Sequence, residues 1–264
     1  MWHIKSSINN LLAIRSQIGS LHGSDELCVL LYSLAKREKP ATVIELGTGL
    51  GVTSVWIAAA MQENGHGLLY TYDNGSHYQK PGVQDFIANL DGPLRELAGR
   101  ADSSAYSDFM EEVFRFAGVN RHVRFRETDI ALDGSTTDKD LGDEKIGWLF
   151  SDFNHSPETL QRLLRTYLPR MESCGSIFFD SASTFLPSFY TLERLVDMLN
   201  TNKLPTALVE GIDDRGAERL AAFICRHRFR LMHLVEKAER AQNSTAWIKI
   251  EPCDVVPAGA TYLR

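Results

Sequence analysis

The stretch from Val43 to Trp56, VIELGTGLGVTSVW, joins a strand-like segment to a helix-like segment through a glycine-rich turn. Glu45 interrupts the apolar run, and glycines then occupy the alternate positions 47, 49 and 51. Glycine permits a tight turn and lets the backbone approach a ligand closely. A helix that begins at Val52 would point its first free amide groups at that ligand. The pattern therefore predicts a ligand site between the first strand and the helix that follows it.

The residues around the glycines restrict the kind of ligand. The dinucleotide fingerprint requires its third glycine where Val52 stands, which counts against NAD. A nucleotide triphosphate loop requires a lysine, and none occurs between Lys39 and Lys80. Glu45 would repel a pyrophosphate but suits a cationic amine or sulfonium. These residues favour a nucleoside without phosphates.

Strand-like runs alternate with helix-like stretches along the rest of the chain. This alternation predicts an α/β fold with a mostly parallel sheet and helices on both faces. The predicted strands are 42–46, 68–72, 123–127, 146–150, 176–179 and 207–210, with an antiparallel C-terminal hairpin at 229–235 and 245–250. The predicted helices are 4–17, 24–37, 52–62, 107–116, 158–171, 188–200 and 214–227.

The length of 264 residues predicts a single domain, 1–264. Residues 1–40 are expected to form an N-terminal helical cap. The connection from Gly75 to His122 far exceeds the roughly one dozen residues that a simple crossover needs. We therefore expect residues 75–121 to form a partly inserted helical lid over the substrate pocket, although a dimer contact or a passive cover is an equal alternative.

Charge and hydropathy exclude several classes of partner. The formal charge of −6 argues against non-specific binding to nucleic acid or to an anionic membrane. No apolar run approaches the roughly 20 residues of a membrane span, and the N-terminus lacks a signal-like apolar region. Four cysteines without C-x-x-C spacing indicate neither a disulfide framework nor a zinc site. A cytoplasmic protein is expected, and a homodimer is left open.

Acidic residues stand at or just after five successive predicted strands. Ligands of such sheets bind at the carboxyl ends of the strands. One acid there could simply cap a helix, but five in succession point to a polar ligand site. They are Glu45, Asp73, Asp129, Asp152 and Asp180. Asp73 follows the second strand, where an acceptor for ribose hydroxyls is expected.

Five motifs in order resemble those of class I S-adenosylmethionine-dependent methyltransferases, closest to members that methylate small molecules on oxygen. They are VIELGTGLGVTS, LYTYDN, VRFRETDI, IGWLFSDFNHSPETL and GSIFFDS, and they extend from Thr42 to about Ser181. The resemblance implies a Rossmann-like sheet of seven strands, S-adenosylmethionine as cofactor, and a small-molecule acceptor.

Transferred position by position, the resemblance implies a cofactor site spread over three strand ends. The residues that would line the methionine and ribose portion are Glu45, Gly47, Thr48, Gly49 and Gly51, with Thr53 and Ser54 either near the carboxylate or capping the helix. Those that would hold the ribose and adenine are Asp73, Asn74, Asp129 and Ile130. Asp152 is assigned to the cofactor site as well as to catalysis.

The fourth and fifth strand ends bear on the chemistry. Related metal-dependent enzymes bind a divalent cation such as Mg²⁺ with acids at these positions, which Asp152 and Asp180 match. Ser181 and Asn154 stand where further ligands are expected, so metal use remains an alternative and not the first expectation. Without a metal, His155 is the candidate general base, because imidazole side chains titrate near neutral pH. The alternative for His155 is a packing role.

Three functions remain open at this stage. The first is methyl transfer to an oxygen, or a nitrogen, of a small metabolite. The second is a non-methyl displacement on the same cofactor, either cyclisation or aminocarboxypropyl transfer, which would release methylthioadenosine. The third is a non-catalytic nucleoside-binding module. Aromatic residues in the loop after the fifth strand, Phe185, Phe189 and Tyr190, are candidates for an acceptor pocket or for core packing.

Overall fold

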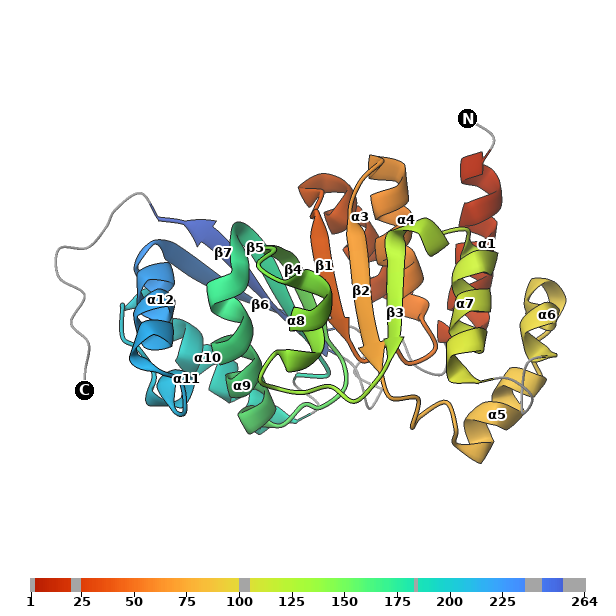
Figure 1. Ribbon diagram of the computed structural model, residues 1–264. Coiled ribbons are helices and arrows are strands. Elements are labelled where there is room, and N and C mark those ends of the chain that lie inside the picture. The colour runs from red at the N-terminus through yellow and green to blue at the C-terminus, as the bar shows by residue number, and fades with distance from the viewer. Residues whose placement is uncertain (1–2, 20–24, 100–104, 183–184, 236–243, 254–264) are drawn as a thin grey trace. The chain divides into compact units, whose positions relative to one another are not determined.

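The computed structural model describes residues 3–19, 25–99, 105–182, 185–235 and 244–253. The chain divides into two compact units, Met1–Ile130 and Ala131–Arg264, which are described separately below. Figure 1 shows the elements in chain order. Among the described residues, no helix combines the length and the apolar character needed to cross a membrane.

The first unit is built on three parallel strands in the order β3-β2-β1. They are β1 (Thr42–Leu46), β2 (Leu68–Asp73) and β3 (Val123–Glu127). All five residues of β1 are buried, which explains the apolar run in the sequence. The register pairs Glu45 with Thr71 and Asp73 with Glu127. Polar side chains of all three strands therefore gather at one edge.

The helices of the first unit are α1 (His3–Gln17), α3 (Asp25–Glu38), α4 (Val52–Asn64), α5 (Pro81–Ala88), α6 (Arg95–Ala98) and α7 (Tyr106–Ala117), with 3₁₀ turns at Gly92–Leu94 and Asn120–His122. Helix α4 is apolar on nearly every side because it packs against both β2 and α3. Helix α7 buries one face against β3. Both crossover helices begin at the edge where the strands end.

The inserted segment packs against the N-terminal helix. Gln17 of α1 and Asp91 exchange two hydrogen bonds, from Gln17 Nε2 to the Asp91 carbonyl at 3.3 Å and from the Asp91 amide to Gln17 Oε1 at 3.2 Å. Asn10 also donates to the Phe116 carbonyl at 2.7 Å. The two segments predicted as parts of one cover are thus joined, and their role as a lid stays a prediction.

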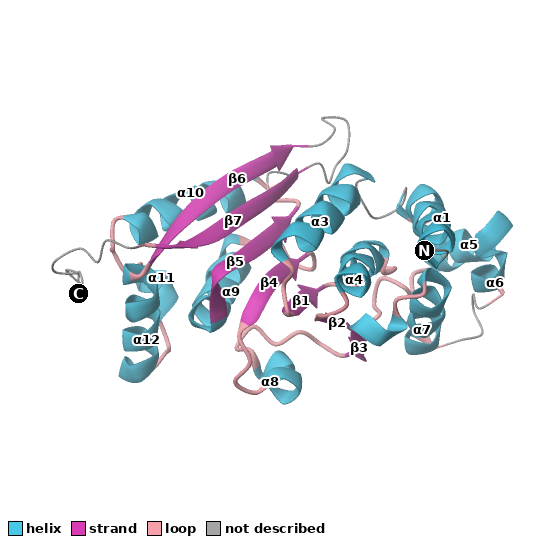
Figure 2. Ribbon diagram, turned by 90° about the horizontal axis from the view of Figure 1, so that it is seen from above, coloured by secondary structure: helices cyan, strands magenta, loops and turns pink. Residues whose placement is uncertain are grey.

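The second unit contains strands in the order β4-β5-β7-β6, as Figure 2 shows. They are β4 (Ile146–Ser151), β5 (Met171–Asp180), β6 (His227–Val235) and β7 (Ser244–Pro252). β4 and β5 are parallel, whereas β7 runs antiparallel to both β5 and β6. The predicted fold class, a mostly parallel sheet with an antiparallel C-terminal hairpin, is confirmed.

The helices of the second unit are α8 (Ser135–Leu141), α9 (Pro157–Tyr167), α10 (Leu186–Asn200), α11 (Thr206–Val209) and α12 (Asp214–Cys225), with a 3₁₀ turn at Leu168–Arg170. α10 and α12 contact β6, and α9 contacts α10 and α11. Ser156 caps α9 by accepting a hydrogen bond from the Thr159 amide at 3.2 Å, and Pro157 takes the first helical position, as predicted.

The strand predicted at 207–210 is wrong, because this segment forms the short helix α11. Pro205 precedes the helix, and Gly211, with φ +77°, follows shortly after it. The proline and the glycine each change the direction of the chain, so the segment between them has room for a single helical turn. Leu208 is fully buried. A short apolar run is compatible with either a buried strand or a buried helical turn, and periodicity alone does not separate them.

The boundary between α9 and β5 also differs from the prediction. The helix predicted to reach residue 171 ends at Tyr167, and a 3₁₀ turn containing Pro169 leads directly into β5 at Met171. The strand is therefore longer at its start than the predicted 176–179. The helix predicted to reach residue 227 likewise ends at Cys225, because β6 begins at His227.

Candidate cofactor and catalytic sites

The glycine-rich turn after β1 is a compact loop with one open side. Gly49 has φ +55°, and a Cβ built there would meet no atom within 4 Å. Gly51 has φ +80°, and a Cβ there would lie 2.6 Å from Met110 Cε of α7. Gly51 thus allows α7 to pack closely, whereas Gly49 keeps a left-handed turn beside free space. The open side of Gly49 is where a ligand could approach the backbone.

Asp73, the last residue of β2, links two loops. Its Oδ2 accepts a hydrogen bond from the Gly49 amide at 3.0 Å, and its Oδ1 accepts one from the Gly75 amide at 2.8 Å. One carboxylate therefore fixes both the loop after β1 and the loop after β2. Each of these oxygens retains capacity to accept a further bond, for instance from a ribose hydroxyl.

Glu45 is fully buried, with no exposed surface. Its Oε2 accepts hydrogen bonds from the Ser54 hydroxyl and, at 2.5 Å, from the Thr71 hydroxyl. The Thr48 hydroxyl bonds in turn to that of Thr71 at 2.6 Å. Glu45 Oε1 is buried and has no hydrogen-bond partner among the described residues. An unmatched carboxylate oxygen costs free energy and would gain from a cationic donor.

Burial dominates the electrostatics of Glu45. Desolvation raises the pKa of its carboxyl from 4.5 to about 7, with a smaller contribution in the same direction from the Asp73 charge. The hydrogen bonds from Ser54 and Thr71 oppose this rise in pKa. A positively charged amine beside Oε1 would favour the ionised carboxylate.

The loops after β2 and β3 are joined by side chains. Asn74 Nδ2 donates to Asp129 Oδ1 at 2.9 Å, and Asn74 Oδ1 accepts from the Ser76 amide at 3.0 Å. Asp129 is exposed and Ile130 is half-buried. Thr53 is half-buried in the first turn of α4.

The cofactor residues predicted in the first unit therefore lie on three consecutive loops at one edge of its sheet. Sequence reasoning missed three contributors, Thr71, Tyr106 and Glu127. Tyr106 donates from its hydroxyl to the Gly49 carbonyl at 2.6 Å, and Glu127 accepts from the Ser107 amide at 3.1 Å. Thr71 pairs with Glu45 in the register of β1 and β2, which no local sequence signal specifies.

In the second unit, Asp152 and His155 follow β4. His155 Nε2 lies 3.7 Å from Asp152 Oδ1, and both side chains are partly exposed. The main-chain oxygen of His155 accepts a hydrogen bond from the Ser188 hydroxyl of α10, which holds the loop in place. This distance allows an ion pair when the imidazole is protonated. An imidazole beside a carboxylate is an arrangement that can take up a proton.

Asp180 ends β5 and is held by neighbouring hydroxyl groups. Thr245 Oγ1 donates to its Oδ1 at 2.8 Å, and Ser181 Oγ donates to its Oδ2 at 3.2 Å. Desolvation raises the pKa of Asp180, whereas the Thr245 bond and the His155 charge lower it. Nowhere in the described ranges do three or more His, Cys, Asp or Glu residues form a group that could hold a metal ion. One or two carboxylates can hold Mg²⁺ when water completes its coordination, so a metal at Asp152 and Asp180 stays an alternative.

Of the three aromatic residues named after β5, two are exposed and one packs against another ring. Phe185 and Tyr190 are 48% and 60% exposed, whereas the Phe189 ring stacks on His233 with centroids 4.1 Å apart. Phe189 is thus engaged in a ring contact within the unit. The part of Phe185 and Tyr190 in an acceptor pocket stays a prediction.

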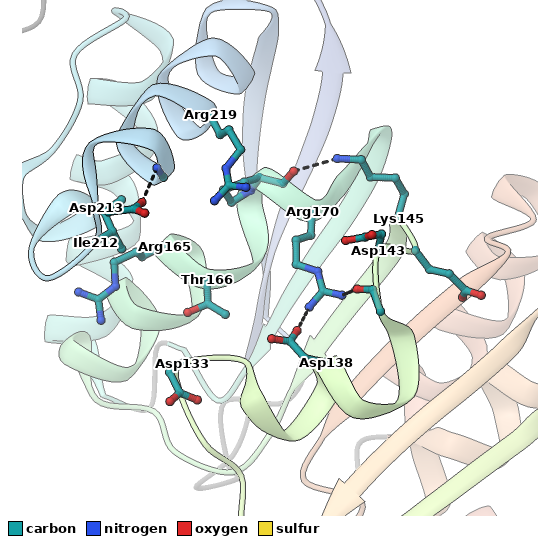
Figure 3. A pocket seen from close by; sticks show the side chains of 14 residues that line it. Asp133, Asp138, Asp143, Lys145, Arg165, Thr166, Arg170, Ile212, Asp213 and Arg219 are labelled. Carbon is teal, nitrogen blue, oxygen red and sulfur yellow. Dashed lines mark hydrogen bonds and ion pairs between the residues drawn. The ribbon is translucent and has the colours of Figure 1, made fainter.

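A separate polar cavity of about 700 Å³ lies in the second unit, before the start of β4 and β5 (Figure 3). Within it, Arg170 pairs with Asp138, and Lys145 donates to the Pro169 carbonyl at 2.9 Å. Its lining contains none of the predicted site residues; it consists of Asp133, Asp138, Gly142, Asp143, Glu144, Lys145, Arg165, Thr166, Pro169, Arg170, Ile212, Asp213, Gly216 and Arg219. The residues predicted to act in catalysis, Asp152 and His155, follow the opposite end of β4.

Part of this chain is similar in sequence to curated proteins. A 74-residue segment is 38% identical to a protein of Mycobacterium sp. (strain JLS) named "Putative O-methyltransferase", and an 86-residue segment is 36% identical to a protein of the same name from Mycolicibacterium vanbaalenii. These segments cover 27% and 32% of this chain and only 33% and 37% of the relatives, so the chain matches about a third of their length.

Solved structures share the fold at low sequence identity. The O-methyltransferase TomG from Streptomyces achromogenes, in complex with S-adenosylmethionine, aligns over 93% of this chain and 89% of its own, with TM-score 0.51 and 17% identity. The O-methyltransferase from Bacillus cereus, in complex with S-adenosylhomocysteine, aligns over 93% and 91%, with TM-score 0.51 and 14% identity. Both alignments support the Rossmann-like sheet predicted from the sequence.

A family model described as a methyltransferase domain matches residues 44–182, which is just over half of the 264 residues. The match begins in β1 and ends just after β5, so it includes the glycine-rich turn and the five strand-end acids. The chain belongs to this methyltransferase domain family.

Proposed function

We propose that the protein transfers a methyl group from S-adenosylmethionine to an oxygen, or a nitrogen, of a small-molecule acceptor. The observation that carries the proposal is the combination of the buried Glu45 Oε1, which lacks a partner, with the Gly49 turn held by Asp73. These residues fit a ligand with a cationic amine and a ribose, and they offer no cation for a pyrophosphate.

The first unit would bind and orient the cofactor. Glu45 would accept a hydrogen bond from the cofactor's amine at Oε1, while Asp73 would accept from the ribose hydroxyls. Asn74, Asp129 and Ile130 would lie near the adenine. When bound, S-adenosylmethionine supplies an activated methyl group, so the protein has to align the acceptor more than to activate the donor.

The proposed proton acceptor follows β4. His155 would remove a proton from the acceptor's hydroxyl group, and Asp152 would stabilise the imidazolium that results. Positioned acid–base groups of this kind contribute about 10²- to 10⁴-fold to a rate. The hydrogen bond from Ser188 to the His155 main chain would limit movement of the loop.

The relatives and the solved structures support this choice among methyl transfer, other displacement and binding alone. The curated relatives carry the name "Putative O-methyltransferase", and two structural neighbours are O-methyltransferases bound to S-adenosylmethionine or S-adenosylhomocysteine.

A cytoplasmic location and a homodimer remain predictions. Cell fractionation would test the location, and sedimentation would test the homodimer.

Mass spectrometry of the nucleoside product tests the proposal. The purified protein is incubated with S-adenosylmethionine and a panel of phenols, alcohols and amines, and the products are identified. Methyl transfer predicts S-adenosylhomocysteine and an acceptor heavier by one methylene unit. Methylthioadenosine would instead indicate displacement at another carbon, and bound cofactor without turnover on any acceptor would indicate a binding module.

A further inference from the structure

Tyr106 is the first residue of α7 and comes from the inserted segment, yet it contacts the loops after both β1 and β2. Only 3% of its surface is exposed. Its hydroxyl donates to the Gly49 carbonyl at 2.6 Å. Since Asp73 accepts from the Gly49 amide at 3.0 Å, both polar groups of Gly49 are bound. The direction of the peptide groups around the open side of this turn is thereby fixed.

The ring of Tyr106 also shapes the second loop. A Cβ at Gly75, which has φ +73°, would lie 2.8 Å from Tyr106 Cδ1, so the ring packs directly on the glycine backbone. The Gly75 amide donates to Asp73 at 2.8 Å. Tyr106 and Asp73 therefore hold the same two loops, one from the inserted segment and the other from β2.

Neighbouring groups keep Tyr106 in place. Its ring lies 5.1 Å from that of Tyr78 and 5.2 Å from that of Phe125, the second in an edge-to-face arrangement. The next amide, of Ser107, donates to Glu127 at the end of β3. Burial, and then the charges of Asp73, Glu45 and Glu127, raise the pKa of the phenol, so the hydroxyl stays protonated and acts as a donor.

We propose that Tyr106 is a positioning residue for the cofactor, which orders the Gly49 turn and the Gly75 loop so that the backbone and Asp73 meet the adenosyl group in binding geometry. The inference rests on the proposed function for the identity of the ligand. It assigns part of cofactor recognition to the inserted segment, whose predicted role was to cover the acceptor. A tyrosine that only fills the core would affect stability but not the cofactor.

The variant Tyr106→Phe keeps the ring and removes the hydroxyl. A lost hydrogen bond of this type predicts that the Kd for S-adenosylhomocysteine and the KM for S-adenosylmethionine rise about fivefold to tenfold, with a smaller change in kcat. In the ligand-free protein, amide hydrogen exchange should become faster in peptides that cover residues 47–54 and 73–76. The exchange experiment needs no cofactor and so does not depend on the proposed function.

Tyr167→Phe is the matched control. Tyr167 is a fully buried tyrosine of the second unit whose hydroxyl is 3.2 Å from that of Thr137. The Tyr167→Phe variant should have a lower melting temperature. Its Kd for S-adenosylhomocysteine and the amide exchange of the two loops should stay at the wild-type values. Wild-type exchange and wild-type Kd in Tyr106→Phe would overturn the inference and leave the proposed function standing. If the two loops exchange faster in Tyr106→Phe but the wild-type protein binds no S-adenosylmethionine, the ordering role stands and the proposed function is wrong.

Discussion

The cofactor edge of the first unit and the acid–histidine pair of the second unit are built differently. At the cofactor edge, Glu45 and Asp73 each accept two hydrogen bonds from neighbouring residues, and Glu45 is fully buried. In the second unit, Asp152 and His155 are partly exposed and 3.7 Å apart. The first arrangement is organised before a ligand binds. The second leaves the side chains more freedom, which suits contact with a varied acceptor.

The difference has an energetic side. Burying Glu45 with an unpartnered oxygen destabilises the ligand-free protein, and a bound cation would recover part of that free energy. Asp152 and His155 are partly exposed, so their desolvation costs less free energy. Substitutions in the first unit should therefore change cofactor binding and pH-dependent stability, whereas those in the second should change turnover.

The largest expected effect is on turnover in His155→Ala. Loss of a general base should lower kcat by about 10²- to 10⁴-fold while the Kd for S-adenosylhomocysteine stays near the wild-type value. Steady-state kinetics and calorimetry measure the two quantities. His66→Ala, at an exposed histidine between α4 and β2, is the control. A kcat within threefold of wild type would remove His155 from the chemistry.

The second effect is on stability as a function of pH. The folded-state pKa of Glu45 is raised to about 7, so the folded protein holds this proton more tightly than the unfolded chain. The resulting stability is fully present below pH 4.5 and is lost as the pH rises through about 7, a change of about 3 kcal/mol. Urea unfolding from pH 4.5 to 8 measures it.

Glu45→Gln should reduce that pH dependence, because glutamine does not titrate. Asp180, whose pKa is also raised, remains in both proteins and keeps part of the dependence. The same variant should weaken cofactor binding, since a neutral amide cannot pair with a cationic amine. Parallel pH profiles for the variant and the wild type would show that Glu45 does not titrate in this range.

Third in size is the loss of cofactor affinity in Asp73→Ala. Each charge-assisted hydrogen bond lost is worth about 1.5–3 kcal/mol, which corresponds to roughly 10- to 100-fold in Kd. Asp85→Ala removes an exposed acid of α5 and controls for net charge. Calorimetric titration with S-adenosylhomocysteine gives both constants, and unchanged affinity in Asp73→Ala would contradict the ribose assignment.

The smallest expected effect is that of a chelator. Asp180 accepts from Thr245 and Ser181, and no metal-binding group of three or more acids, histidines or cysteines occurs in the described part of the chain. Because His155 is the proposed proton acceptor, turnover should be the same with and without EDTA. Loss of activity that Mg²⁺ restores would reassign Asp152 and Asp180 as metal ligands.

Sequence patterns were sufficient for elements with a strong local signal. β1 and β3 have the predicted bounds: β1 is a continuous buried run that ends at a glycine, and β3 alternates apolar and polar residues and ends in polar ones. Residues 207–210 were misassigned because three apolar residues followed by Glu210 fit a strand as well as one helical turn, and contact with α9 decides between them.

The site was predictable where a residue stands next to a motif and not where tertiary packing brings it in. Glu45, Asp73 and Asp129 stand at or just after the ends of strands and could be named as candidates from the chain alone. The Thr71 bond to Glu45 depends on strand register, and the Tyr106 bond to Gly49 joins residues far apart in sequence. No local pattern around Tyr106 indicates that contact.

Calorimetric titration of the wild-type protein with S-adenosylhomocysteine and, separately, with NAD tests most directly whether the loops of the first unit hold an adenosyl group without phosphates. Saturable binding of S-adenosylhomocysteine at one site per chain, with no heat from NAD, is the predicted result. Binding of NAD, or no binding of S-adenosylhomocysteine, would contradict it.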